Sequence, residues 1–211
     1  QPQFDAQINT ALDVNAVLRM VALEILCGIG DSYIVPNPTH AHNLRIFTPV
    51  DGGAATFLPW DMDFSYFEST SASIFPGSSF NLSKLVNNAA NRRWYYYHIN
   101  DLCQMAYNPA YITPWLLHYG SVVTQNLASA SSYISSRRSF ALSQLPAAVA
   151  FAITTSSGNN FTTNASVIAL SGNGWIDVRD IEVNGIPYPV VWTSSTAWSL
   201  NYPLASGLNQ L

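Results

Sequence analysis

The stretch TFLPWDMDF, residues 56–64, ends an apolar run at a proline and then places two carboxylates two positions apart. If the backbone is still extended there, side chains alternate between its two faces, so Asp61 and Asp63 point to the same side. Carboxylates held that close repel each other and lose hydration, and a divalent cation compensates for both costs. The stretch therefore predicts a hard-metal site. The alternative is a turn in which one Asp caps a following helix and the other is solvated.

A β-hairpin is expected to carry this stretch. Residues 43–47 have the pattern of a strand, residues 50–53 (VDGG) have that of a tight turn, and residues 56–60 return as the partner strand. The ends of a tight hairpin lie next to each other. Asn43 and Asp61 are therefore expected to be neighbours in space although they are eighteen positions apart.

A core helix is predicted upstream, over residues 14–27. Its apolar residues recur at spacings of three and four, with Asp13 as the N-cap and Gly28 at the C-terminal turn. Arg19 and Glu24 are expected to lie off the apolar stripe. The helix leads directly into the segment GIGDSY, residues 28–33, which contributes a further carboxylate, Asp31.

The rest of the chain changes character near Pro146. Before it, helical patterns extend over residues 81–90, 92–105, 111–131 and 132–145. After it come short alternating runs at residues 166–170, 176–183, 186–192 and 198–202, with Asn184-Gly185 as a two-residue hairpin turn. The expected fold class is α+β, with a first domain at residues 1–148 and a small antiparallel β module of sandwich type at residues 149–211. The sequence ends at residues 208–211, where a further strand would be expected.

Composition narrows the function classes. Only 9% of the residues are charged, and one of them, Lys84, is the only lysine, whereas aromatic residues make up 13%. This polar-neutral composition is typical of an extracellular or cell-surface protein. The net charge of −4 provides no electrostatic footprint for nucleic acid. No stretch of 18 or more apolar residues predicts a membrane span, and no secretory leader is present, so an export signal is expected to have been removed.

The two cysteines, Cys27 and Cys103, match no metal-binding spacing. Two alternatives remain open for them, a disulfide in an oxidising compartment or two free thiols on buried helices.

With Asp31, Asn43, Asp61 and Asp63 identified, the chain resembles the CotH family of secreted protein-kinase-like enzymes. The resemblance runs from about residue 13 to residue 145. It rests on four motifs, which are CGIGDSY at residues 27–33, HNLRIF at 42–47, LPWDMD at 58–63 and YISSRRSF at 133–140. It implies a mostly helical, kinase-like C-terminal lobe whose β-hairpin carries the metal motif, followed by an Ig-like β module.

The resemblance also implies roles for the four polar residues. In protein kinases a catalytic-loop Asp meets the acceptor hydroxyl, while an Asn and a second Asp hold magnesium. If these roles apply to this chain, Asp31 is the catalytic carboxylate, Asn43 is a neutral metal ligand and Asp61 is the principal metal ligand. Asp63 is either a second ligand or a support for Asp61. The implied cofactors are ATP with Mg²⁺ or Mn²⁺.

Two features depart from ordinary kinases. In those kinases four residues lie between the Asp and the Asn, whereas eleven lie between Asp31 and Asn43. The loop 32–42 must therefore fold back, and Pro36, Asn37 and Pro38 favour such a return. The Gly-rich strand pair that covers the phosphates in kinases, and the lysine on a strand, do not precede Asp13. Lys84 is a poor substitute for that lysine because it follows the Asp61–Asp63 motif. The nucleotide-holding N-terminal lobe is therefore expected upstream of residue 1, and this fragment alone is expected to be inactive.

The function implied for the parent protein is that of an extracytoplasmic kinase that transfers the γ-phosphate of ATP to Ser or Thr of secreted or surface proteins. A second hypothesis is a non-catalytic surface or adhesion protein that keeps a kinase-like scaffold and binds through its β module. A third is structural binding of Ca²⁺ by the Asp cluster, since oxygen ligands suit both cations. The sequence does not indicate the acceptor protein or the oligomeric state.

Overall fold

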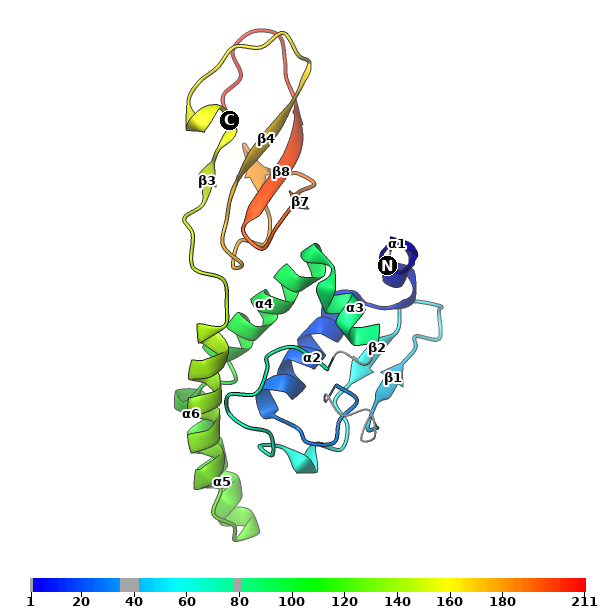
Figure 1. Ribbon diagram of the computed structural model, residues 1–211, viewed down its shortest axis with the longest axis vertical. Coiled ribbons are helices and arrows are strands. Elements are labelled where there is room, and N and C mark those ends of the chain that lie inside the picture. Colours follow the sequence, from blue (N-terminus) through cyan, green and yellow to red (C-terminus); the bar gives the residue numbers. More distant parts are fainter. Residues whose placement is uncertain (1, 35–41, 78–80) are drawn as a thin grey trace. The chain divides into compact units, whose positions relative to one another are not determined.

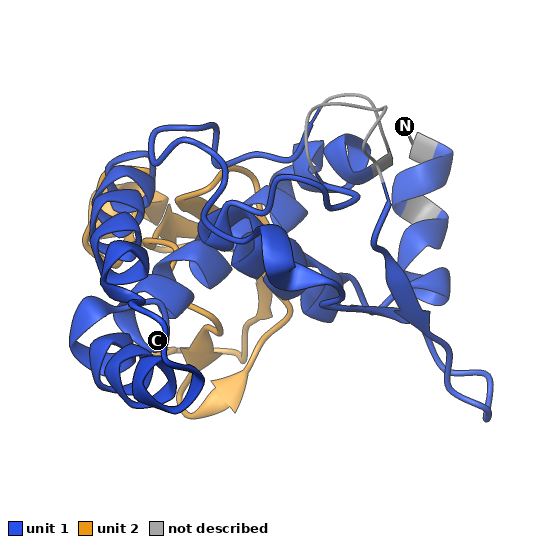
Figure 2. Cartoon of the chain, turned by 90° about the horizontal axis from the view of Figure 1, so that it is seen from below, with its two compact units in different colours: residues 1–145 blue, residues 146–211 orange. Residues whose placement is uncertain are grey.

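The computed structural model describes residues 2–34, 42–77 and 81–211, and the chain divides into two compact units, residues 1–145 and 146–211 (Figure 2). The α+β class predicted from the sequence is confirmed, because the α-helices lie in unit 1 and unit 2 is built of short antiparallel strands. In order, unit 1 contains α1 (Pro2–Ala11), α2 (Val14–Cys27), β1 (Arg45–Phe47), β2 (Thr56–Leu58), the 3-10 helix η2 (Met62–Phe64), α3 (Asn81–Asn87), α4 (Ala89–Gln104), α5 (Pro109–Val123) and α6 (Ala128–Ser143) (Figure 1).

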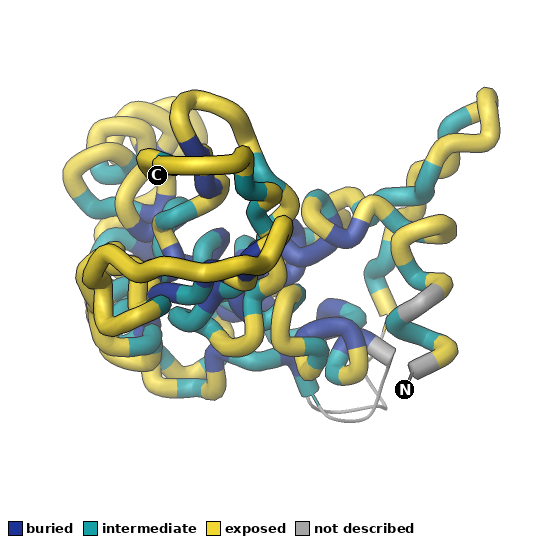
Figure 3. The backbone as a smooth tube through the Cα atoms, turned by 90° about the horizontal axis from the view of Figure 1, so that it is seen from above, coloured by how far each residue is buried: buried dark blue, intermediate teal, exposed yellow. Residues whose placement is uncertain are grey.

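Helix α2 is the centre of unit 1, and its predicted limits are confirmed. The backbone N–H of Ala16 donates to Oδ1 of Asp13 at 3.0 Å, and Gly28 ends the helix in the left-handed conformation at φ 59°. Val17, Leu18 and Leu26 are fully buried, and α4, α6 and β2 pack around the helix (Figures 1 and 3). This packing sets the position of residues 28–34, which follow α2.

One prediction about α2 is wrong. Glu24 was expected off the apolar stripe, yet it is only 2% exposed. Other elements of unit 1 cover the side of α2 that carries Glu24, so the helix is buried over more than the single stripe that its apolar spacing indicates.

The predicted β-hairpin is present as a two-stranded antiparallel sheet. Arg45 pairs with Leu58 and Phe47 pairs with Thr56 across it. The turn between the strands is exposed and contains Gly52 at φ 82° (Figure 3). An isolated parallel bridge between Leu12 and Ala55 fixes the hairpin to the segment that joins α1 to α2.

Two of the helix assignments need correction. Helix α1 was not predicted, although Phe4, Ile8 and Leu12 recur at a spacing of four and pack against the core. The single helix expected over residues 111–131 is two helices, since Thr124 adopts φ 54° and the N–H of Gln125 bonds to the carbonyl of Gly120. Asn126 then accepts a hydrogen bond from the N–H of Ala128, at the start of α6. No glycine or proline marks this break in the sequence.

Unit 2 contains a four-stranded antiparallel sheet with strand order β3-β4-β8-β7 and a separate two-stranded hairpin, β5-β6. The strands are β3 (Ala152–Ile153), β4 (Val167–Asn173), β5 (Glu182–Val183), β6 (Ile186–Pro187), β7 (Val191–Trp192) and β8 (Ala197–Pro203). The predicted hairpin turn is confirmed, since Asn184 and Gly185 join β5 to β6 with φ of 53° and 77°. The strand predicted over residues 176–183 is wrong except for its last two residues, and β3 was not predicted.

Unit 2 has a small core of its own, formed by Ile168, Leu170, Ile181, Trp198 and Leu200. Because this core is separate from that of unit 1, each unit has its own source of apolar stabilisation. Within the part of the chain that the structure describes, none of the helices combines the length and apolar character needed to cross a membrane.

Both cysteines are free thiols in this structure, so the disulfide alternative is not observed. Burial raises the pKa of Cys27 to about 12 and that of Cys103 to about 11, which keeps both thiols protonated at neutral pH.

Candidate functional site

The structure brings Asp31 and Asn43 into direct contact. Nδ2 of Asn43 donates to Oδ2 of Asp31 at 3.1 Å and to the Asp31 carbonyl at 3.4 Å. Nε2 of His42 lies 3.4 Å from the same Oδ2. One oxygen of the Asp31 carboxylate is therefore held by two neighbours that come directly before β1.

The other oxygen of Asp31 has no such support. Oδ1 is buried and accepts no hydrogen bond from the residues that the structure describes. Burial of a carboxylate oxygen without a hydrogen-bond donor lowers the stability of the folded state. This oxygen is therefore a candidate acceptor for a hydroxyl proton or for a bound group.

The loop between Asp31 and Asn43 returns to its starting point, as its predicted role requires. An isolated parallel bridge joins Ser32 to His42, which places the two ends of the loop side by side. Pro36, Asn37 and Pro38, on which the prediction of this return depended, lie outside the described residues.

Asp61 and Asp63 lie on a turn, so the extended backbone that would place them on one side is absent. The turn that was the alternative is present, although the Asp61 side chain makes no capping hydrogen bond. Asp61 adopts the left-handed conformation, φ 54° and ψ 59°, and Met62–Phe64 forms the 3-10 helix η2. Oδ1 of Asp63 accepts a hydrogen bond from the N–H of Phe64. The local physical reason is that Pro59 and the 3-10 turn end the β2 ladder, which stops at Leu58.

The two carboxylates nevertheless interact, and they also interact with Asp31. The pKa of Asp61 is raised, first by the negative charge of Asp63, then by partial desolvation and a side-chain hydrogen bond to Asp63, and further by the charge of Asp31. His42 acts in the opposite direction and lowers this pKa. Asp61 therefore lies within the electrostatic field of Asp31.

Main-chain hydrogen bonds connect the two carboxylate segments. The N–H of Gly30 donates to the carbonyl of Phe64 at 3.1 Å, and the N–H of Tyr66 donates to the carbonyl of Cys27 at 2.7 Å. The N–H of Phe67 donates to the carbonyl of Gly28 at 3.0 Å. The segment that precedes Asp31 is thus bonded directly to the segment that follows Asp63.

The residues present fit a hard divalent cation by their chemistry. They offer oxygen donors, an excess of negative charge and the buried, unpartnered Oδ1 of Asp31. Within residues 2–34, 42–77 and 81–211, no three His, Cys, Asp or Glu side chains converge closely enough to form a complete metal cluster. Asn43 and main-chain carbonyls would supply further oxygen ligands.

A sequence model of the family described as CotH kinase protein matches residues 1–117, which is more than half of the chain. The chain belongs to the CotH kinase family. The matched region contains Asp31, Asn43, Asp61 and Asp63. A search of curated proteins found no match to the chain.

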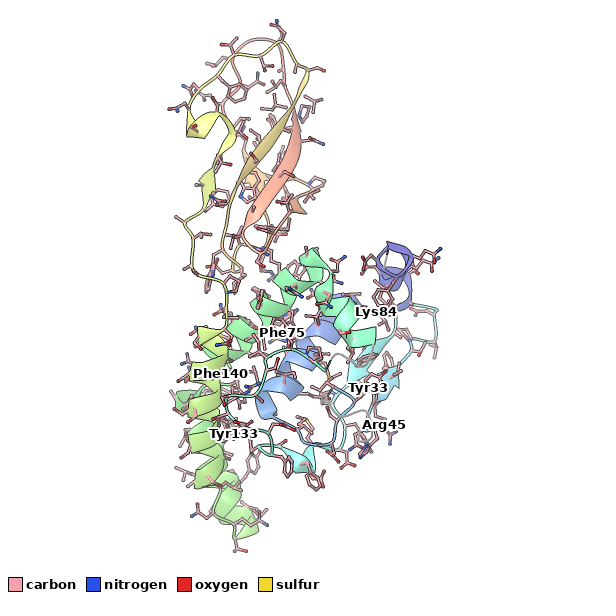
Figure 4. All side chains as sticks on the ribbon, viewed as in Figure 1. Tyr33, Arg45, Phe75, Lys84, Tyr133 and Phe140 are labelled. Atoms are coloured by element: carbon pink, nitrogen blue, oxygen red, sulfur yellow. The ribbon has the colours of Figure 1, made fainter. Side chains whose placement is uncertain are left out.

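Three polar residues of this CotH kinase family member were not predicted as part of the site. His42 contacts Asp31, and Glu24 is buried beside Ser32, the residue after Asp31. Arg137, on α6, is 1% exposed and bonds to the carbonyl of Ile25 at the end of α2. Figure 4 labels Tyr133 and Phe140 of the same helix. For His42, its position next to Asn43 was an available signal. Arg137 stands in the YISSRRSF motif at residues 133–140, to which no role was given, and no sequence pattern indicated the burial of Glu24.

Arg45, labelled in Figure 4, contacts the residue that precedes Asp61 in this CotH kinase family member. Its guanidinium carbon is 3.7 Å from the centre of the Trp60 ring, a cation–π contact. This contact fixes Trp60, the residue before Asp61, against β1.

Proposed function

We propose that this chain is part of an extracytoplasmic CotH-type protein kinase that transfers the γ-phosphate of ATP to Ser or Thr of secreted or surface proteins. Membership of the CotH kinase family supports kinase-like chemistry. The observation that carries the residue assignment is the contact of Asp31 with Asn43, together with the field that Asp31 exerts on Asp61. The low content of charged residues, 9%, supports an extracellular or cell-surface location.

In this proposal Asp31 is the catalytic carboxylate. Asn43 and His42 hold Oδ2 and so fix the orientation of the carboxylate, which leaves Oδ1 to accept the proton of the acceptor hydroxyl. Because one oxygen is held and the other is not, the two oxygens have different roles.

Asp61, Asp63 and Asn43 would hold the divalent cation, Mg²⁺ or Mn²⁺. The cation, when bound with ATP, neutralises negative charge on the nucleotide phosphates. Mutual repulsion between Asp61 and Asp63 favours cation binding, because a positive charge between them relieves the repulsion that raises the pKa of Asp61.

Phosphate transfer by the parent protein, with radiolabelled ATP and Mg²⁺ or Mn²⁺, tests this assignment. Asp31→Asn is expected to lower kcat by about 10²–10⁴-fold, the usual contribution of a general base. Asp61→Asn is expected to reduce activity and to raise the concentration of metal needed. Asp51→Asn is the matched control, since Asp51 is an exposed carboxylate in the hairpin turn that bonds only to Gly53 among the described residues.

Retained activity in both Asp31→Asn and Asp61→Asn would contradict the assignment. The second candidate function is a non-catalytic surface or adhesion protein, and the separate core of unit 2 favours it because such a unit can bind a partner by itself. No phosphate transfer and no heat on calorimetric titration of the parent with ATP and Mg²⁺ would favour this second function. Binding of Ca²⁺ without any response to ATP would favour a structural calcium site.

A further inference from the structure

All five N–H donors of Arg137 bind main-chain carbonyls. Nε and Nη2 donate to the carbonyl of Ile25 at 3.3 and 3.1 Å, and Nη2 also donates to that of Ser73 at 3.2 Å. Nη1 donates to the carbonyls of Thr70, at 3.3 Å, and Ala72. The guanidinium group is therefore saturated with hydrogen bonds although the residue is 1% exposed.

The surroundings of Arg137 differ from those of an ordinary buried arginine. Among the described residues no carboxylate forms an ion pair with it, so its charge is compensated by carbonyl dipoles. Ile25 belongs to the last turn of α2, where the helix dipole favours a cation, and its carbonyl also accepts the N–H of Gly28 at 3.3 Å. The fixed fork of the guanidinium group matches carbonyls from two separate segments, which a lysine ammonium cannot reproduce.

The two segments that Arg137 joins both lead to the candidate site. The end of α2 continues through Gly28 and Gly30 to Asp31, and residues 70–73 follow the Asp61–Asp63 turn along the chain. Main-chain hydrogen bonds between residues 27–30 and 64–68 already connect these segments near the site. Arg137, on α6, joins the same two segments a second time, farther from the site. Helix α6 lies outside the region that the family model matches.

We propose that Arg137 is a positioning residue, which sets the separation between Asp31 and the Asp61–Asp63 pair by fixing residues 70–73 against the end of α2. The inference rests on the proposed kinase function for its catalytic consequence. Its structural part, the fixing of the segment that contains residues 66–68, can be measured without any activity.

Arg138 provides a matched control on the same helix. Its Nε donates to the carbonyl of Cys103 at 2.6 Å, and its Nη2 donates to Oε1 of Gln104 at 3.3 Å. Arg138 thus also bonds from α6 to main chain, but it reaches the end of α4 and none of the described residues of the site. Loss of Arg138 removes an arginine–carbonyl contact without touching residues 70–73.

The experiment compares the parent protein with its Arg137→Met, Arg137→Lys and Arg138→Met variants. Amide hydrogen exchange is followed at Tyr66, Phe67 and Glu68, whose N–H groups bond to the carbonyls of Cys27 and Gly28. In Arg137→Met we expect exchange at these amides to accelerate by about tenfold or more. We also expect kcat to fall on the order of a hundredfold, with KM for ATP nearly unchanged. Arg137→Lys should lie between the wild type and Arg137→Met in both measurements, and Arg138→Met should match the wild type.

Wild-type exchange and wild-type kcat in a folded Arg137→Met variant would overturn the inference, and so would an equal effect of Arg138→Met. If Arg137→Met does not fold, amide exchange and kcat are measured on Arg137→Lys instead, and wild-type values of both would overturn the inference. If the wild-type parent transfers no phosphate, the proposed function fails, whereas the exchange rates still decide whether Arg137 fixes the segment.

Discussion

Glu24 makes the stability of unit 1 depend on pH in a direction opposite to that of most carboxylates. Burial raises the pKa of this carboxyl from 4.5 to about 7, and a hydrogen bond from Ser32 offsets only part of the effect. The folded protein therefore retains a proton on Glu24 at pH values where the unfolded chain has lost it. Between pH 4.5 and about pH 7 the folded state binds more protons, so the free energy of unfolding falls as pH rises.

The size of this effect follows from the two pKa values. Each unit of pKa difference corresponds to about 1.4 kcal/mol, so the shift on Glu24 amounts to about 3 kcal/mol. This stability is fully present below pH 4.5 and is lost as pH rises to about 7. That loss is a large part of the stability of an ordinary domain.

Glu24→Gln removes the titration while it keeps the size of the side chain and a polar group for Ser32. The difference in unfolding free energy between Glu24→Gln and wild type should be small at pH 4 and should reach about 3 kcal/mol in favour of the variant at pH 8. Chemical denaturation followed by far-UV circular dichroism measures it, since the described α-helices all lie in unit 1. Glu182→Gln, at an exposed position on β5, controls for the change in net charge. A pH-independent difference for Glu24→Gln would refute the reasoning.

Two further predictions concern the geometry around the site. Gly28→Ala should lower the free energy of unfolding by about 3 kcal/mol, because Gly28 has φ 59° and a Cβ there would collide with the hydroxyl of Tyr133. Gly52→Ala should cost only about 1 kcal/mol, because Gly52 has φ 82° but open space around it, and equal costs in thermal unfolding would contradict the role of Tyr133. Asp63→Asn should lower the pKa of Asp61 towards its ordinary value, since the charge of Asp63 is the first cause of the upward shift. A carboxyl NMR titration measures this change, with Asp51→Asn as the control, and an unchanged pKa would show that the two carboxylates do not interact.

The parts of the fold that the sequence predicted well are those with strong local signals. Asp13 and Gly28 limit α2 because an N-cap side chain and a left-handed residue are needed at its ends. The glycines after Asp51 and the Asn184-Gly185 pair mark the two hairpin turns, because such turns need residues that adopt positive φ.

The predictions that failed depended on tertiary packing. The burial of Glu24 comes from elements that cover α2, and no local pattern records it. The break at Thr124 places a β-branched residue at positive φ, which the residue type does not indicate, whereas the turn at Asp61 was one of two alternatives that the sequence left open. Hairpin geometry predicted that Asp61 lies near Asn43. Arg137 belongs to a motif that the resemblance used, but no local pattern indicates that it reaches the end of α2 across a separation of more than one hundred positions.

The convergence of Asp31, Asn43, Asp61 and Asp63 on one cation site is tested most directly by titration of the chain with Mn²⁺, monitored by electron paramagnetic resonance. We expect one site whose affinity falls on the order of tenfold or more in both Asn43→Ala and Asp61→Asn, while Asp51→Asn binds as the wild type does. Binding that is unchanged in both Asn43→Ala and Asp61→Asn, or the absence of any site in the wild type, would contradict this account.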